Sequence, residues 1–562
     1  MQADICLING RVVNVYSGEI LEQNVALAGD KIIYVGPSDN RIGSNTKVID
    51  AGGDFVLPGF FDAHAHADLY CNPRAYMDFV ITRGTTGFFN DGHDLANALG
   101  AGPYLNMTAQ LSRGIGDIYT GVPVASPPFP GIEGRDLWTD EDLRQALAVD
   151  RVLSVSEVTP YLRLVRGDEK LEKRLALAQK HDRLIEGHTT GANVDKLNRL
   201  AAAGVTSCHE SLSSADVIDR LRLGYAVMLR HGSIRQDLPR LIEAVKKLQY
   251  YDTSRLMLVT DGIFPDHLIC RGNMDWVITE AIGLGIDPVR AIQMATINPA
   301  RYFKLDHQIG GIAPGRKANL LVATSLKQPT PRLVIYGGMP VAENGNLLVP
   351  AGDCPVSGTG NRPFKIKPLT VDAFRVSKIG GNPLVPVIRI VDQTVTDRQD
   401  LGISCEEGEY RPQNDVLKIV LMNRKGTQAG KGFVKGFCPG LGGIASTIAH
   451  ETHGLMIMGC ADADMARAAN EVLAMDGGIC LVQHGEVKAR IPLPVGAIAS
   501  AEDIPTLAAE IATLHKEIEN LGCTLPYPLW TLGFLSFTSV LRLRITYSGV
   551  FDVKEGKIVF TG

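Results

Sequence analysis

The feature that most constrains the fold of this chain is a regular alternation of short apolar strands and helical stretches between residues 58 and 305. Strands that alternate with helices predict βαβ units and a parallel sheet. Eight such units in roughly 250 residues match the size of a (β/α)8 TIM-like barrel. The predicted barrel strands are residues 59–64, 85–90, 107–112, 152–157, 184–188, 205–209, 226–230 and 256–261.

Polar side chains stand at the carboxyl ends of these strands, where barrel enzymes place their chemistry. Two histidines at the end of the first strand are two positions apart, so both side chains point to the same side of it. Taken singly, each polar residue has an ordinary structural explanation, but their shared position predicts a metal centre. The six candidate ligands are His64, His66, Glu157, His188, His209 and Asp261.

This ligand set suits two divalent ions. The two first-strand histidines and Asp261 are expected to hold one ion, His188 and His209 the other, with Glu157 bridging them. Imidazole and carboxylate ligands suit zinc, iron and manganese alike, so the sequence does not identify the metal. Two ions close together lower the pKa of a shared water, and Asp261 is predicted to carry its proton.

Composition excludes several classes of protein. A net charge of −5 gives no support for nucleic-acid binding. No window of 18 or more continuous apolar residues predicts a membrane span, and the first residues do not resemble a signal peptide. Ten cysteines without a Cys-x-x-Cys pair indicate reduced thiols, so we expect a cytoplasmic protein.

The sequence on either side of the barrel predicts further domains. Residues 4–57 and the segment from 306 to about 350 read as short strands, with hairpin turns predicted at Asn9-Gly10 and Gly29-Asp30. Residues 350–363 are rich in Gly, Pro and Ser and predict a linker. An α+β domain should follow it. Its clearest helix is 505–521, which carries one apolar stripe and is capped by Asp503 or Glu502.

Several motifs resemble the adenine deaminase family of the amidohydrolase superfamily, and the resemblance runs nearly end to end. The segments that carry it are PGFFDAHAH at 58–66, NDGHDLAN at 90–97, Gly187-His188, AGVTSCHE at 203–210, Thr260-Asp261, MATINPA at 294–300 and IAPGRKA at 312–318. The last two are common to many amidohydrolases. The element at 91–94 and the long C-terminal region are more specific to adenine deaminases.

The resemblance implies a domain plan for the chain. Residues 1–57 and 306–355 should together form a small β-sandwich domain, flanking a metal-dependent barrel at 58–305. Residues 356–562 should form a C-terminal α+β domain of the adenine deaminase type.

The resemblance also implies an activity, the hydrolytic deamination of adenine to hypoxanthine and ammonia, usually with iron or manganese. The expected catalytic residues are His93, Glu157, His209 and Asp261. We expect a small-molecule substrate, a purine base or a related heterocycle, and a homo-oligomer.

The sequence departs from the family pattern where a purine would be recognised. The family usually has a glutamate where Asp68 stands, and a second acid after the eighth strand where this chain has Gly262. These differences leave open an N6-substituted adenine or another amino-heterocycle as the substrate. A cyclic-amide hydrolase is disfavoured because no lysine stands at the Glu157 position. A non-catalytic barrel is disfavoured by the complete ligand set.

Three residues are predicted to bind substrate: Asp68, Asp91 and Arg230. The alternative for Asp91 and His93 is a turn with a helix cap, and the alternative for Arg230 is an ion pair with a neighbouring acid. The element His450-Glu451-Thr452-His453 resembles a zincin motif, but its histidines are three residues apart rather than four, which excludes a protease of that class. A role for this element beside the substrate is the remaining hypothesis.

Overall fold

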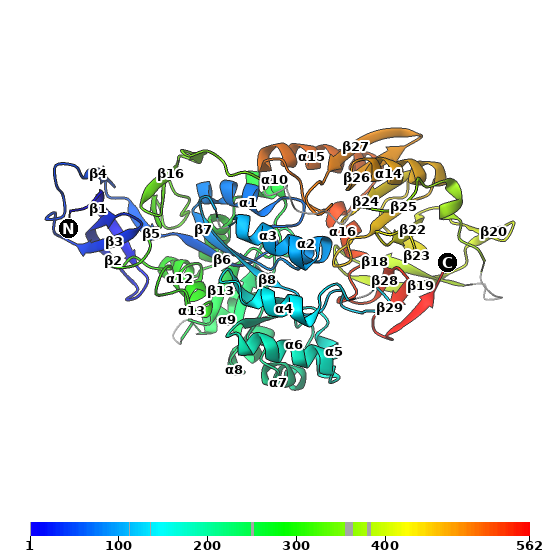
Figure 1. The fold of residues 1–562 in the computed structure, drawn as a ribbon, viewed down its shortest axis with the longest axis horizontal. Coiled ribbons are helices and arrows are strands. Elements are labelled where there is room, and N and C mark those ends of the chain that lie inside the picture. Colours follow the sequence, from blue (N-terminus) through cyan, green and yellow to red (C-terminus); the bar gives the residue numbers. More distant parts are fainter. Residues whose placement is uncertain (1, 112, 135, 249–251, 355–363, 379–383) are drawn as a thin grey trace.

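The computed structural model describes residues 2–111, 113–134, 136–248, 252–354, 364–378 and 384–562. Three regions follow one another along the long axis of the molecule (Figure 1). The N-terminal strands, in blue, lie at one end, the barrel lies in the middle, and the C-terminal region, yellow to red, lies at the other end. Within the described part of the chain, no helix is both long enough and apolar enough to cross a bilayer.

The middle region is a closed barrel of eight parallel strands. It consists of two arcs joined at both seams: the Thr206 amide donates to the Ile185 carbonyl at 2.9 Å, and Ala65 forms a parallel bridge with Asp261. The predicted barrel is therefore confirmed. Its strands are β6 (Phe60–Ala65), β7 (Thr85–Asn90), β8 (Asp117–Val122), β9 (Val152–Val158), β10 (Leu184–Gly187), β11 (Ser207–Cys208), β12 (Ala226–Arg230) and β13 (Leu256–Val259).

Helices follow the strands along the chain, and several begin at side chains that accept backbone N–H groups. Thr139 and Asp142 form a capping box, while Asn193 and Ser213 cap the helices after β10 and β11. The helices of this region are α1 (Pro73–Val80), α2 (His93–Leu99), α3 (Ala101–Leu111), α4 (Asp140–Leu147), α5 (Tyr161–Val165), α6 (Glu169–Lys180), α7 (Val194–Ala202), α8 (Ser214–Arg222), α9 (Leu238–Leu248), α10 (Pro265–Cys270), α11 (Met274–Gly283), α12 (Pro288–Met294) and α13 (Ile297–Tyr302).

The prediction of the third barrel strand was wrong. Residues 107–111 belong to helix α3, in which Tyr104, Met107 and Leu111 are buried at helical spacing. The third barrel strand is instead β8, which follows this helix in the chain. Gly114 and Gly116 have positive φ angles and turn the chain between the helix and this strand.

The N-terminal residues and the segment after the barrel share one nine-stranded sheet. The predicted Gly29-Asp30 hairpin is confirmed between β2 and β3. The Asn9-Gly10 hairpin was wrong, because β1 runs through both residues with a shift in register, and a Cβ at Gly10 would lie 2.6 Å from Val56. The strands are β1 (Ile5–Asn14), β2 (Glu19–Ala28), β3 (Lys31–Gly36), β4 (Lys47–Asp50), β5 (Phe55–Pro58), β14 (Leu320–Ala323), β15 (Leu333–Tyr336), β16 (Met339–Glu343) and β17 (Asn346–Leu347).

The C-terminal region is built on an eight-stranded mixed sheet, with helix α14 (Asp462–Ala474) packed on it. The predicted long helix is confirmed as α15 (Ile504–Asn520), capped by the Asp503 side chain. Residues 355–363 of the predicted linker lie outside the described residues, and the domain limits stay a prediction. The strands of this sheet are β18 (Val385–Ile390), β19 (Thr396–Leu401), β22 (Val416–Met422), β23 (Ala429–Lys435), β24 (Gly443–Ser446), β25 (Leu455–Gly459), β26 (Gly478–Gln483) and β27 (Glu486–Pro492).

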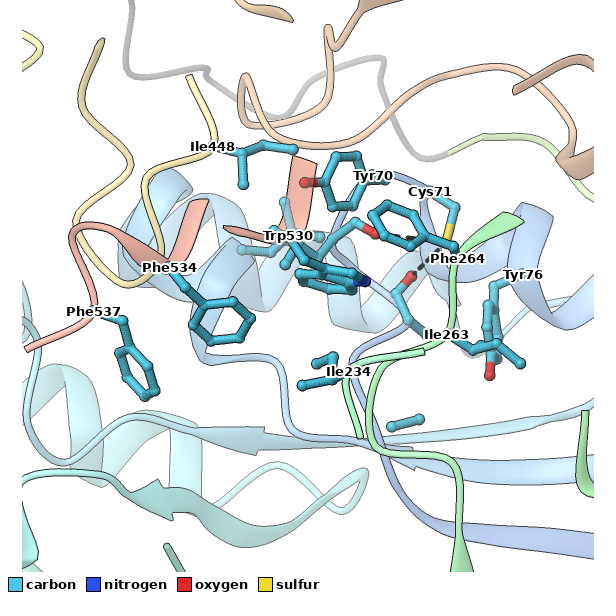
Figure 2. Close-up of a cluster of buried hydrophobic side chains, with 14 of the residues drawn as sticks. Tyr70, Cys71, Tyr76, Ile234, Ile263, Phe264, Ile448, Trp530, Phe534 and Phe537 are labelled. Atoms are coloured by element: carbon cyan, nitrogen blue, oxygen red, sulfur yellow. Dashed lines mark hydrogen bonds between the residues drawn. The ribbon is translucent and has the colours of Figure 1, made fainter. Parts of the chain in front are cut away.

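Aromatic side chains join the C-terminal region to the barrel. Trp530, on helix α16 (Pro528–Phe534), packs against Tyr70 and Phe264 with ring centroids 5.3 and 4.9 Å apart. Figure 2 shows Phe534 and then Phe537 continuing away from this cluster. The two regions therefore share a buried core, and the row of rings leads from that core toward the carboxyl ends of the barrel strands.

Candidate metal centre and substrate cavity

Glu157 lies at the centre of the predicted ligand set. Its Oε2 atom is 3.0 Å from His188 Nδ1, 3.0 Å from His209 Nε2 and 3.9 Å from His64 Nε2. Burial alone would raise the pKa of this carboxyl, but the two nearest histidines hold it well below its usual range. An ionised carboxylate therefore faces three imidazoles, which is the arrangement expected of a bridging ligand.

Asp261 closes the ligand set beside the first strand. Its Oδ1 atom is 3.4 Å from His66 Nε2 and 3.7 Å from His64 Nε2. The backbone of Asp261 bonds to the end of β6, because its N–H donates to the His64 carbonyl and its carbonyl accepts from the N–H of His66, the residue after the strand. Asp261 has a φ of 63°. This sparsely populated conformation is typical of functional sites.

The chemistry of these donors fits divalent ions. Both ring nitrogens of His64 are buried and have no hydrogen-bond partner among the described residues. Burial lowers the pKa of His64 to about 3, so the ring is neutral and can offer a lone pair. The sets His64–His66–Glu157, His64–His209–Asp261 and Glu157–His188–His209 each bring three donor atoms within 4.8 Å of one another.

His93 and Asp91 lie next to this centre but do not line the cavity in front of it. His93 Nδ1 makes a short contact with Asp91 Oδ1, and the other Asp91 oxygen accepts the Glu157 N–H at 2.7 Å. Asp91 thus orients both His93 and the strand that carries Glu157. Its predicted contact with substrate stays a prediction.

Asp68 is also buried away from the cavity. Its Oδ2 atom accepts the Leu95 N–H at 3.1 Å, in the first turn of α2. Burial and the neighbouring Asp94 carboxylate raise the pKa of Asp68 to about 6. The structure therefore places Asp68 as a helix-capping side chain, and its predicted contact with substrate remains untested.

Arg230 lines the cavity, but carboxylates surround it. Its Nη1 atom makes a short contact with Glu210 and lies 3.1 Å from Asp261 Oδ2, while Nε donates to Asp237 at 2.9 Å. The ion-pair alternative is thus what the geometry shows, and the contact with Asp261 links Arg230 to the ligand set. Sequence reasoning did not single out Glu210 as a site residue, although it stands beside His209 in the chain.

A cavity of about 200 Å³ opens in front of the ligand set. Its floor is formed by barrel residues that include five of the six predicted ligands. Phe537 packs edge-on against both His188 and His450, with ring centroids 5.8 and 4.6 Å apart. The C-terminal region therefore forms one wall of the cavity, through Asp392, Thr394, Val395, His450, Phe534, Phe537 and Val540.

Most of these wall residues carried no signal in the sequence, because a phenylalanine far along the chain looks like any core residue. The His450 element was the exception, since two histidines three residues apart drew attention to it. A larger cavity, of about 370 Å³, lies between Glu133 and Lys425 and includes none of the predicted ligands.

Two family models match this chain. The amidohydrolase family model matches residues 55–341, and the model of the adenine deaminase C-terminal domain matches residues 393–557. The first of these ranges contains the whole barrel, and the second contains all the named residues of the cavity wall except Asp392.

The chain is also similar over its full length to curated proteins. Adenine deaminase from Moorella thermoacetica is 33% identical over 571 residues, covering 100% of this chain and 96% of that protein. The adenine deaminases of Desulforamulus reducens and Cenarchaeum symbiosum are 32% and 31% identical, with 96% and 92% of their lengths covered. The chain therefore belongs to the adenine deaminase family of the amidohydrolase superfamily.

Proposed function

We propose that this protein catalyses the hydrolytic deamination of adenine, in which adenine and water give hypoxanthine and ammonia. The observation that carries the proposal is the convergence of six nitrogen and oxygen donors at the carboxyl ends of five barrel strands, beside a cavity of about 200 Å³. The relatives named adenine deaminase extend over the same length of chain, which supports the choice of substrate.

We assign two divalent ions, of manganese, iron or zinc, to this site. His64, His66 and Asp261 would hold one, His188 and His209 the other, and Glu157 would lie between them. When bound, such ions supply a water of lowered pKa at neutral pH.

The remaining chemistry belongs to the side chains. Attack of water at C6 makes a tetrahedral carbon, and the C6–N6 bond breaks only when the amine is protonated. Asp261 lines the cavity and can carry that proton, while Arg230 holds its second oxygen in place. His93, between Asp91 and Asp94, is a second proton carrier one side chain further away.

Two aromatic rings of the cavity wall would orient a flat heterocycle. The ring centroids of Phe534 and Phe537 are 5.5 Å apart, and both rings lie on the side of the cavity that the C-terminal region contributes. An aromatic base placed against these rings would point one edge toward the donors of the barrel.

One observation favours a second candidate, an N6-substituted adenine. At Gly262, where the family usually has a second acid, a Cβ would lie 2.4 Å from Ile234 and 3.3 Å from Trp530. Ile234 lines the cavity, so the wall beside Gly262 presents an apolar side chain, which suits a small alkyl substituent.

The test is a substrate panel with protein loaded separately with manganese, iron or zinc. Ammonia release from adenine, with hypoxanthine formed in equal amount, is the expected result. Methylamine release from N6-methyladenine at higher kcat/KM would select the second candidate. Turnover of dihydropyrimidines or hydantoins without turnover of aminopurines would overturn both proposals.

A further inference from the structure

Asp94 stands between two histidines of the barrel and two of the C-terminal region. Its Oδ2 atom is 3.6 Å from His66 Nδ1 and 3.5 Å from His93 Nε2. Its Oδ1 atom is 2.8 Å from His453 Nε2 and 3.2 Å from His450 Nδ1. Asp94 is fully buried, and among the described residues its carboxylate faces histidine side chains from both regions.

The two ring nitrogens of His66 have different surroundings. Nε2 faces Asp261 and the proposed ion, whereas Nδ1 faces Asp94. A histidine that binds a metal nearly always donates its other N–H to a carboxylate or carbonyl, which fixes the ring and its tautomer. Asp94 is the carboxylate that stands at this place for His66.

Of the four histidines around Asp94, His453 makes the shortest contact with its carboxylate. The ring is fully buried, and burial lowers its pKa to about 4, so a neutral ring donates Nε2–H to the carboxylate. The backbone of His453 is fixed as well. Its N–H donates to the Ala449 carbonyl at 2.7 Å, and its carbonyl accepts from Arg424 Nε at 2.8 Å.

We infer that His453 is a positioning residue of the metal centre. Acting through Asp94, it orients His66, so the C-terminal region sets the affinity with which the barrel holds the ion beside His66 and Asp261. This inference rests on the proposed metal centre and adds a role that the barrel cannot perform alone.

The test compares two substitutions at one position. His453→Leu removes the donor, whereas His453→Gln keeps an amide donor at about the reach of Nε2. The apoproteins are titrated with Mn²⁺ against a chelator of known affinity, and bound metal is counted by mass spectrometry. We expect His453→Leu to bind one of two ions about 10–100-fold more weakly and His453→Gln to restore most of that affinity.

A double-mutant cycle tests whether His453 acts on His66 through Asp94. Asp94→Asn alone should weaken the same ion, and adding His453→Leu to it should cause little further loss, because both changes break one chain of contacts. Additive losses would overturn the route through Asp94. His515→Leu is the matched control, since His515 is a half-buried histidine of the same region that contacts Phe264 instead.

The outcomes separate this inference from the proposed function. If the wild-type protein binds two ions and deaminates adenine, equal affinities in wild type and His453→Leu overturn the inference alone. If the wild-type protein binds no metal, the proposed centre itself is wrong. Should His453→Leu fail to fold in thermal unfolding, the Asp94→Asn and His453→Gln titrations still decide, because both keep a polar side chain of similar size.

Discussion

The two regions added to the barrel differ in what they contribute to the cavity beside the ligand set. The nine-stranded sheet packs a core of its own, with Leu7, Leu27, Val56 and Leu320 among its buried residues. The other face of the sheet, with Leu57, Leu321 and Val334, belongs to one continuous core with the barrel, and the C-terminal region joins the same core through Trp530 and its aromatic neighbours. Of these two regions, as far as their described residues go, only the C-terminal region contributes side chains to the cavity beside the ligand set.

The polarity of the barrel strands explains this difference. Strand β5 of the sheet ends at Pro58 and β6 begins at Phe60, so the sheet adjoins the amino ends of the barrel strands. The C-terminal region covers the opposite, carboxyl ends (Figure 1). Chemistry in such barrels is confined to the carboxyl ends, whereas the amino ends serve stability. The comparison teaches that position along the barrel axis decides which added domain takes part in the site.

Loss of a metal ligand from the barrel should have the largest effect on turnover, and the effects of changes in the two added regions are compared with it. We expect lower bound metal and no turnover from each of three substitutions, His64→Ala, Glu157→Ala and His188→Ala, because each removes one of the six predicted metal ligands. Metal analysis and ammonia release measure this. Two full equivalents of metal in all three variants would contradict the two-ion assignment.

The next largest effect should come from Asp261→Asn, a change at the barrel rim that spares both added regions. The amide can still offer an oxygen to an ion but cannot carry a proton. We expect most of the metal to remain and kcat to fall about 10²–10⁴-fold. If turnover stays within a few-fold of wild type, the proton carrier is another group, with His93 or His209 next in line.

Phe537→Ala tests whether the C-terminal region belongs to the site. Losing this wall should raise KM about 10-fold and change kcat little, since the ring would contact substrate equally in the ground and transition states. Phe374→Ala is the control, because Phe374 is a buried ring in a separate core cluster of the same region. Equal KM values for Phe537→Ala and wild type would show that this ring of the C-terminal region does not contribute to substrate binding.

The smallest effect on catalysis is expected from the N-terminal sheet. Leu27→Ala removes a fully buried side chain and should lower the free energy of unfolding of that region by about 2–5 kcal/mol. At a temperature where the variant is folded, kcat and KM should equal those of wild type. A clear fall in kcat of folded protein would show that the sheet is coupled to the site after all.

Local patterns were enough to predict most of the barrel and the residues at its strand ends. Residues two positions apart on a strand point to the same side, so the shared side of His64 and His66 follows from the strand period alone. The third strand was missed because glycines surround β8, and the helical stripe of α3 was read as a strand. At Asn9-Gly10, pairing with β2, β4 and β5 kept the strand intact despite the strong turn signal.

The contacts across the interface could not be predicted in this way. Nothing near Asp94 in the sequence indicates that its carboxylate meets His453, 359 positions further along. Arg230 shows a related limit, since the pattern placed it at the strand end but could not foresee that Glu210, Asp237 and Asp261 would all contact it. The roles of the site residues therefore stay predictions, whereas their places are known.

The aromatic joint between the barrel and helix α16 has a consequence for biosynthesis. A chain made from residue 1 onward can fold its barrel before Trp530 exists, because domains generally fold as units during synthesis. Until then Tyr70 and Phe264 present their rings to water, and the cavity lacks its C-terminal wall. An exposed patch of this kind promotes association with other chains. Shortened forms of the protein that end before helix α16 should therefore precipitate in cells, even though their barrel is complete.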